Sequence, residues 1–246
     1  MKPDVRKLYQ VVEATWPPAE QVIAGPWVLR VGAGGGKRVS AATKRARFDA
    51  GIDIPAAEEA MRFMGQDPLF MIRDGETDLD EALEARGYRI IDPVNLYLCP
   101  VHSLTDKLLP RVRVFTIWEP LAWMREAWAK AGIGAARQEV MARVKGPKTA
   151  LLGRINDKPA GVGFCAIDDA RDVAMVHALE VVPSQRRQGL AAWMMRGAAF
   201  WAADWGTEWL AVLCTQQNDA ANALYQGLGM ELVGQYHYRI LGDEES

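Results

Sequence analysis

Residues 179–192 read Leu-Glu-Val-Val-Pro-Ser-Gln-Arg-Arg-Gln-Gly-Leu-Ala-Ala, and this stretch decides the fold prediction. It ends an apolar strand predicted over 173–182 and opens a helix predicted over 189–204. Arg186 and Arg187 lie at the positive end of that helix dipole, where cations are disfavoured unless an anion offsets them. The free amides of the first helical turn converge there, and Gly189 lets the backbone approach a ligand closely. A di- or polyphosphate is one interpretation of this turn, and an exposed basic loop is the other.

The sequence around this turn, residues 106–246, is predicted to form one mixed α/β domain. Asn156 and Asp157 are predicted as the polar turn of an antiparallel hairpin. Trp193, Trp201 and Trp205 fall on one face of the helix 189–204, together with Gly197, which predicts an aromatic stripe in the core. The predicted strands are 112–117, 149–155, 160–167, 173–182, 209–214 and 231–240, and the predicted helices are 121–130, 135–144, 189–204 and 219–228.

The preceding residues, 1–105, are predicted to form a separate domain. The glycine-rich segment 32–36 is interpreted as a hairpin turn, with 38–42 returning as the partner strand. A weak internal repeat places Gly87 on Gly229, so that residues 82–91 align with 224–233. The predicted helices here are 5–15, 55–64 and 79–86, and the predicted strands are 27–31, 69–73 and 94–99.

Composition excludes several classes of protein. Hydrophobic residues make up 50% and charged residues 24% of the 246, as in ordinary globular chains. With 29 basic and 31 acidic side chains, the chain is not expected to bind nucleic acid or a membrane surface. The N-terminus lacks the apolar core of a signal peptide, so a cytoplasmic protein is expected. Cys99, Cys165 and Cys214 form neither a CxxC pair nor a Cys/His cluster, and we expect neither disulfides nor a metal site.

Two motifs in order resemble one family. Arg-Arg-Gln-Gly-Leu-Ala, residues 186–191, resembles the [Q/R]xxGx[G/A] motif of the GNAT superfamily of acyl-CoA-dependent N-acyltransferases. Downstream, Asn-Asp-Ala-Ala-Asn-Ala-Leu-Tyr-Gln-Gly-Leu-Gly-Met, residues 218–230, resembles the family's NxxAxxLYxxxGF segment, with methionine in place of the last aromatic residue. The resemblance covers about residues 110–246 and implies a GNAT-like acetyltransferase fold there.

The resemblance also implies where a cofactor would bind. The amides from Arg187 to Ala192 would hold the pyrophosphate of coenzyme A, and the extended backbone of Leu179 to Val181 would pair with the pantetheine arm. Asn218 would contact the cofactor near the pantetheine. The implied cofactor-binding residues are Leu179, Glu180, Val181, Arg186, Arg187, Gln188, Gly189, Leu190, Ala191, Ala192, Asn218 and Tyr225, with acetyl-CoA as cosubstrate and no metal.

Three residues are candidates for catalysis. Tyr225 stands where many members of the family place the phenol that protonates the departing thiolate, and its alternative is a packed aromatic residue. The family's catalytic glutamate corresponds by spacing to Met175, which cannot accept a proton. His177 and Glu180 are therefore the candidate bases, expected on opposite faces because strand side chains alternate, with His177 slightly preferred. A hydrogen-bonded core histidine, with water acting as the base, is the alternative.

The implied function is transfer of an acetyl group from acetyl-CoA to a primary amine of a small molecule or peptide. The alternatives are transfer of a longer acyl group, acetylation of a protein, a non-catalytic acyl-CoA-binding or sensing protein, and a structural protein.

The segment around Gly87 also resembles the family's last helix and glycine, so residues 1–105 are interpreted as a degenerate GNAT-like domain in tandem with a catalytic domain, 106–246. Leu83 falls at the position of Tyr225 in that copy. Homodimerisation is left open.

Overall fold

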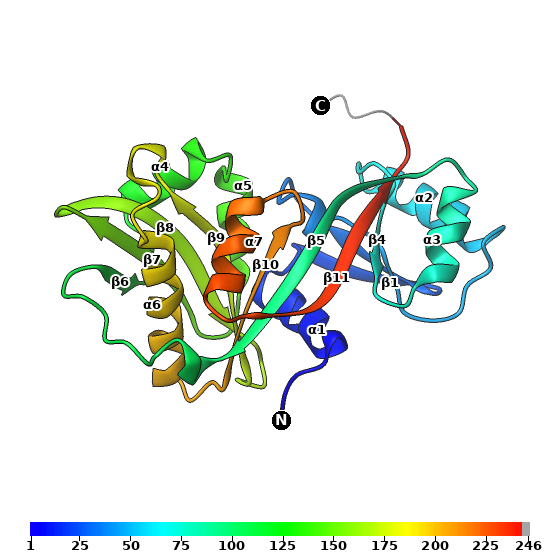
Figure 1. Cartoon of the computed structure of the whole chain (residues 1–246). Coiled ribbons are helices and arrows are strands. Elements are labelled where there is room, and N and C mark those ends of the chain that lie inside the picture. The colour runs from blue at the N-terminus through cyan, green and yellow to red at the C-terminus, as the bar shows by residue number, and fades with distance from the viewer. Residues whose placement is uncertain (243–246) are drawn as a thin grey trace. The chain divides into compact units, whose positions relative to one another are not determined.

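The computed structural model describes residues 1–242, which form two compact units built from interleaved segments (Figure 1). The first unit comprises Met1–Pro17, Leu96–Cys214 and Asn218–Val233. The second comprises Pro18–Asn95, Thr215–Gln217 and the described residues from Gly234 onward. Among the described residues, none of the helices combines the length and apolar composition needed to span a bilayer.

The first unit is built on a mixed sheet that contains five of the six strands predicted for residues 106–246, with the end of β5 in the place of the sixth. Strands β6 to β9 are antiparallel neighbours, and β10 runs parallel to β9. Asn156 and Asp157 form the β7–β8 turn with positive φ angles of 49° and 59°, as the polar turn predicted. The strands, in sheet order, are the end of β5 (Arg89–Pro100), β10 (Trp209–Thr215), β9 (Val173–Val181), β8 (Lys158–Ile167), β7 (Lys148–Ile155) and β6 (Val114–Ile117).

Helix α6 (Leu190–Asp204) covers one face of this sheet (Figure 1). The predicted aromatic stripe in the core is wrong, because Trp193 and Trp201 are only partly buried and Trp205 is 44% exposed. The helix buries small and flexible side chains instead, which lets it lie close to the strands. The buried residues of this face include Met194, Met195, Ala198, Ala199 and Ala202.

The remaining helices of the first unit are α1 (Val5–Thr15), α4 (Ala122–Lys130), α5 (Ala135–Arg143) and α7 (Asp219–Gly227). The end of α1 lies on the sheet face opposite α6, where Trp16 contacts the rings of Phe164 and His177. Gly163, on the neighbouring position of β8, faces Leu151 and Leu179 on the other side. The sheet is therefore covered on both faces, as expected for strands that are buried along most of their length.

The second unit contains a small antiparallel sheet, β1 (Glu20–Ala24), β2 (Trp27–Val31) and β3 (Thr43–Lys44). The return strand predicted at 38–42 is wrong in its position: Lys37–Val39 form a 3₁₀ turn, and the strand that returns to pair with β2 is β3 at Thr43–Lys44. Strand β1 was not predictable from apolar alternation, since most of its side chains are exposed. Helices α2 (Asp53–Phe63) and α3 (Thr77–Glu84) complete a core centred on Trp27, Phe70 and Leu83.

The weak sequence repeat corresponds to a structural one. Strand β4 (Leu69–Arg73), α3 and β5 follow in the same order as β10, α7 and β11 (Glu231–Ile240), 142 positions apart as Gly87 and Gly229 are. Both helices end on a glycine with positive φ, and the next amide returns to the helix: Tyr88 N donates to Leu83 O and Met230 N to Tyr225 O, each at 3.0 Å.

The last strands of the two repeats are exchanged between the units. The end of β5 neighbours β10 in the first unit, whereas β11 pairs antiparallel with β4 in the second. This exchange explains why the compact units are interleaved rather than consecutive. The division into a degenerate domain, 1–105, and a catalytic domain, 106–246, stays a prediction.

Candidate active site

A bulge in β9 sets the geometry of the site. Ala178 has a φ of +51°, and the β8–β9 register shifts between Val162 and Phe164. Trp128 of α4 donates its indole N–H to the Ala178 carbonyl at 2.9 Å, holding the bulge in place. An extra residue in one strand reverses the alternation of the side chains that follow it.

This reversal corrects the expectation that His177 and Glu180 face opposite sides. His177 lies opposite Phe164 and Glu180 lies opposite Val162. Because Val162 and Phe164 are two positions apart in one strand, their partners lie on the same face. The orientation of Glu180 was predicted wrongly because the bulge at Ala178 has no recognisable sequence pattern.

Strands β9 and β10 separate beyond the bulge. Their parallel register runs from Val173 and Trp209 to Val176 and Val212. The backbone of the predicted pantetheine-binding segment, Leu179 to Val181, follows this point on β9. One edge of this segment pairs with β8 through Glu180 and Val181. Its other hydrogen-bonding edge faces the place where β9 and β10 no longer pair.

The turn after β9 contains the residues that are predicted to hold a phosphate. Arg187 and Gly189 have φ angles of +65° and +74°, and Leu190 begins α6. Among residues 1–242, none of the amides from 187 to 192 donates to a backbone carbonyl. A β-carbon at Gly189 would meet no atom within 4 Å, so the space beside this turn is open. Free amides, a helix N-terminus and open space fit a diphosphate.

Tyr225 lies in the core of the first unit at the end of α7. Its side chain is buried, and its ring centroid is 5.6 Å from that of Tyr97. Burial raises the pKa of Tyr225 well above its ordinary value, and Cys214, Glu180 and Tyr97 reinforce the effect. The phenol is therefore protonated throughout the neutral range and can act only as a proton donor there.

Asn218 has a structural role in addition to its predicted contact with coenzyme A. It is the N-cap of α7, and its Oδ1 accepts from the amide of Ala221 at 3.1 Å. Capping accounts for an asparagine here without a cofactor, so its contact with coenzyme A stays a prediction.

His177 is engaged on the α1 side of the sheet. Thr15 donates its hydroxyl to the Val11 carbonyl at 2.6 Å, so it accepts from His177 Nε2–H at 2.9 Å. The imidazole also lies against the ring of Trp16, with centroids 5.0 Å apart, and is only 4% exposed. These contacts are those of a packed, hydrogen-bonded histidine.

Glu180 lines a cavity of about 280 Å³ between α4 and the end of β9. Burial raises the pKa of Glu180, and the positive charge of Arg186 opposes this rise. A carboxylate with a raised pKa next to a cavity has the properties of a general base. The other lining residues are Trp123, Glu126, Ala127, Lys130, Ala131, Val162, Val181, Val182, Pro183 and Arg186.

The contribution of α4 was not predicted. Its residues Trp123 and Lys130 line the cavity, but their sequence pattern is that of an ordinary amphipathic helix. Tyr97, which donates its hydroxyl to Asn222 at 2.8 Å beside Tyr225, was also missed because it comes from the strand exchanged between repeats. Among residues 1–242, no group of three or more His, Cys, Asp or Glu side chains is placed to hold a metal ion.

Part of the chain matches a known protein family. The Acetyltransferase (GNAT) family model matches residues 115–230. A curated relative, "Uncharacterized N-acetyltransferase YobR" of Bacillus subtilis (strain 168), is 23% identical over 243 residues, which are 96% of this chain and 98% of the relative.

Solved structures extend the likeness in fold. A GCN5-related N-acetyltransferase from Kribbella flavida has a TM-score of 0.72 at 22% identity, covering 100% of this chain and 98% of its own. A tandem GNAT protein from the clavulanic acid biosynthesis pathway has a TM-score of 0.61 at 12% identity, covering 94% and 86%. Both predicted motifs lie inside residues 115–230, so the family match identifies this segment of the chain as a GNAT acetyltransferase segment and supports an acyltransferase enzyme.

Proposed function

We propose that the first unit transfers an acetyl group from acetyl-CoA to a primary amine of a small molecule or peptide by direct attack on the thioester. The observation that carries the proposal is the position of Glu180, which lines the cavity between α4 and the end of β9, past the last paired residues of β9 and β10. In the proposal, Glu180 is the base and Tyr225 the acid of one reaction centre.

The amides from Arg187 to Ala192 and the Arg186 and Arg187 side chains would hold the pyrophosphate. The free edge of Leu179 to Val181 would align the pantetheine arm as an added strand. Acetyl-CoA supplies the activated acyl group as a thioester. Residues that hold its non-reacting parts convert binding energy into orientation of that group.

In the proposed step, Glu180 accepts a proton from the ammonium form of the acceptor, directly or through one water. The neutral nitrogen forms the new N–C bond while the C–S bond breaks. Tyr225 donates its phenolic proton to the departing sulfur, which leaves as the thiol. The nitrogen, positively charged after the attack, loses its second proton as the amide forms, and this proton restores the Tyr225 phenol through water. We assign the base to Glu180 rather than His177, since the imidazole of His177 is held by Thr15 and packed on Trp16.

We propose that the reaction takes place in the cytoplasm. The three cysteines are free and buried, which supports this proposal because oxidising compartments favour disulfides. We further propose that the second unit is the degenerate copy, with Leu83 at the position of Tyr225. The structural repeat at 142 positions supports this assignment.

The test is acetyl transfer by the pure protein with a panel of amines and short peptides, measured as thiol release and as the mass of the product. Acetylation of at least one amine, with equal amounts of thiol and product, is expected. Tight binding of acetyl-CoA without transfer to any acceptor would instead favour the sensing alternative. Thiol release without an acetylated product would contradict amine transfer.

A further inference from the structure

The exchanged strands β5 and β11 each place one side chain on the helix of the other repeat. Tyr97 of β5 and Arg239 of β11 occupy equivalent positions, 142 residues apart like the rest of the repeat. In the first unit, the Tyr97 hydroxyl donates to Asn222 Oδ1 of α7 at 2.8 Å and accepts from Gln226 Nε2–H at 3.3 Å. A phenol can make both bonds at once, because its oxygen is a donor and an acceptor. Tyr97 thus holds two side chains that lie one turn apart on α7.

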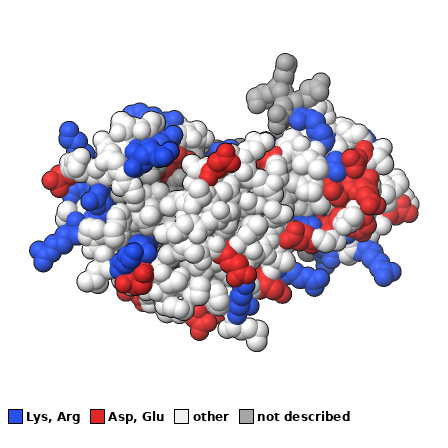
Figure 2. Space-filling model, viewed as in Figure 1, with Lys and Arg blue, Asp and Glu red and all other residues white. Residues whose placement is uncertain are grey.

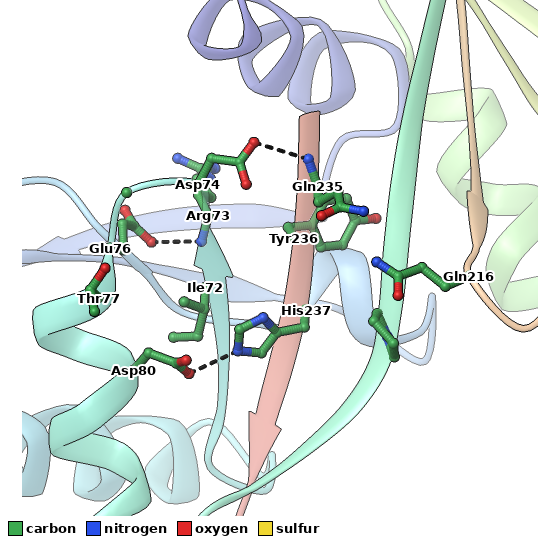
Figure 3. A pocket seen from close by; sticks show the side chains of 12 residues that line it. Ile72, Arg73, Asp74, Glu76, Thr77, Asp80, Gln216, Gln235, Tyr236 and His237 are labelled. Carbon is green, nitrogen blue, oxygen red and sulfur yellow. Dashed lines mark hydrogen bonds and ion pairs between the residues drawn. The ribbon is translucent and has the colours of Figure 1, made fainter. Parts of the chain in front are cut away.

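Arg239 holds α3 in the second unit at the same two helical positions. Its Nε–H donates to Asp80 Oδ1 at 2.7 Å, and its Nη2 lies 3.6 Å from Glu84 Oε2. Asp80 and Glu84 are the repeat equivalents of Asn222 and Gln226. Figure 3 shows Asp80 on α3 with its carboxylate turned toward β11. The contact between an exchanged strand and a helix therefore occurs twice, once in each unit.

The two contacts differ in charge. Figure 2 shows acidic side chains gathered over α3, whose eight residues include Asp78, Asp80, Glu81 and Glu84. Helix α7 carries a single acidic residue, Asp219, in its first turn. The contact is therefore an ion pair in the second unit and a set of bonds between neutral groups in the first. Neutral groups hold α7 without placing a charge beside a phenol, where a charge would shift its protonation.

The neutral contact lies beside the proposed acid. The ring centroid of Tyr225 is 5.6 Å from that of Tyr97, and the ring planes are inclined by 51°. The side chain of Tyr97 is 1% exposed and that of Tyr225 is 4% exposed. Tyr225 is the one buried residue of the nine in α7. The direction of its phenol therefore depends on how this short helix is held.

Asn222 extends the contact to the start of α7. Its Oδ1 also accepts from Cys214 Sγ–H at 3.4 Å, and its Nδ2–H donates to the Asn218 carbonyl at 2.9 Å. Asn218 is the N-cap of the helix. The bond from Tyr97 is thus part of a network that joins β5, β10 and the first turn of α7.

We propose that Tyr97 is a positioning residue for acetyl transfer: by holding Asn222 and Gln226 it directs the Tyr225 phenol toward the departing sulfur. The inference rests on the proposed function, in which Tyr225 is the acid. The ring contact limits the tilt of the Tyr225 ring, and the hydroxyl bonds fix α7 against β5. Because β5 belongs to the first repeat, that repeat contributes to catalysis without holding the cofactor.

The experiment is a double-mutant cycle on kcat with Tyr97→Phe, Tyr225→Phe and the double variant of the full-length protein. The substrates are acetyl-CoA and the panel amine that is acetylated fastest, at a temperature below the unfolding of every variant. Tyr97→Phe keeps the ring and removes the hydroxyl bonds, so kcat is expected to fall about three- to tenfold. The KM for acetyl-CoA and the calorimetric affinity for coenzyme A are expected to change less than about twofold. In the Tyr225→Phe background, the same substitution is expected to change kcat less than about twofold, because no phenol is left to direct.

Asp80→Asn is the matched control, because it removes the charge from the equivalent contact in the second unit. Both Asp80→Asn and Tyr97→Phe are expected to lower the Tm, but only Tyr97→Phe should lower kcat. An equal loss of kcat in Asp80→Asn would show a general effect of stability and would overturn the positioning role.

The remaining outcomes separate this inference from the proposed function. Asn222→Ala removes the same bond from the side of α7, so the cycle can be run even if Tyr97→Phe does not fold, and the same loss is expected. Wild-type kcat in Tyr97→Phe with a lowered kcat in Tyr225→Phe, or fully independent losses in the double variant, would overturn the inference and leave the acid in place. Wild-type kcat in Tyr225→Phe, with the chemical step limiting, would contradict the acid itself and the positioning role with it.

Discussion

Glu180→Gln is the substitution that tests the assigned base. Gln has nearly the same volume and keeps one acceptor oxygen, so the cavity between α4 and β9 keeps its shape. The variant loses the carboxylate whose raised pKa suits proton abstraction. General base catalysis typically contributes about 10²- to 10⁴-fold, and we expect kcat/KM to fall by about 10²-fold or more.

The pH profile makes this prediction specific. Glu180 is active when deprotonated, so kcat/KM should fall as the pH drops through its raised pKa, and this acidic limb should be lost in Glu180→Gln. Arg186 lowers the pKa of Glu180 against the effect of burial. Arg186→Gln should therefore move the acidic limb of the wild-type profile to higher pH, because the protonated carboxyl is no longer disfavoured by that charge.

The assay is steady-state acetyl transfer across pH at saturating acetyl-CoA, with His177→Gln as the matched control. His177→Gln removes the bond to Thr15 in a packed site, so it should lower the free energy of unfolding and leave the acidic limb in place. An acidic limb that disappears in His177→Gln but persists in Glu180→Gln would refute the assignment of the base and restore His177 as the candidate.

Three further outcomes are expected. Tyr225→Phe keeps the ring against Tyr97 and deletes the proton donor, so kcat should fall about 10²-fold while the affinity for coenzyme A, measured by calorimetry, changes little. A variant with the wild-type kcat, under conditions where the chemical step limits turnover, would contradict the role of Tyr225 as the acid. Asp80→Asn removes the nearer of the two carboxylates that pair with the buried Arg239, the other being Glu84 at 3.6 Å, and should lower the free energy of unfolding by about 2–3 kcal/mol at neutral pH. Burial acts to raise the pKa of Asp80, but the bonds from Arg239 and His237 lower it overall, so this difference should shrink on acidification through the lowered pKa, and a difference constant with pH would count against the ion pair. Gly197→Ala would place a β-carbon 2.5 Å from Val114 Cγ1 and should destabilise the protein by about 1–3 kcal/mol in urea unfolding despite the better helix propensity of alanine, whereas a more stable variant would show that α6 does not pack so closely on β6.

The parts of the fold that the sequence predicted are those with a strong local signal. The strands β7 to β10 and the helices α6 and α7 are apolar runs bounded by turn residues, and their boundaries agree within a few positions. The strand–helix junction at residues 182–190 was predictable because the apolar strand ends where a glycine precedes the helix, whereas phosphate binding at this turn stays a prediction. Strand β1 escaped prediction because its exposed side chains carry no alternation.

The arrangement of the site depended on features that the sequence does not display. The bulge at Ala178 places His177 and Glu180 on the same face, and only the pairing with β8 reveals it. The cavity wall formed by α4 and the neighbour Tyr97 come from segments distant in the chain. Exchange of β5 and β11 between the repeats is likewise a matter of strand pairing, which local patterns do not encode.

Calorimetric titration with coenzyme A tests the central claim most directly, because it needs no knowledge of the acceptor. One coenzyme A is expected per chain, and Gly189→Asp should abolish most of the affinity by placing a carboxylate at the open side of the turn, where the pyrophosphate would lie. Gly189→Ala carries the same strain of a non-glycine residue at a φ of +74° without the charge, and should retain more affinity than the aspartate. Unchanged binding by a folded Gly189→Asp protein, or a stoichiometry of two, would contradict the assignment of this turn as the single cofactor site.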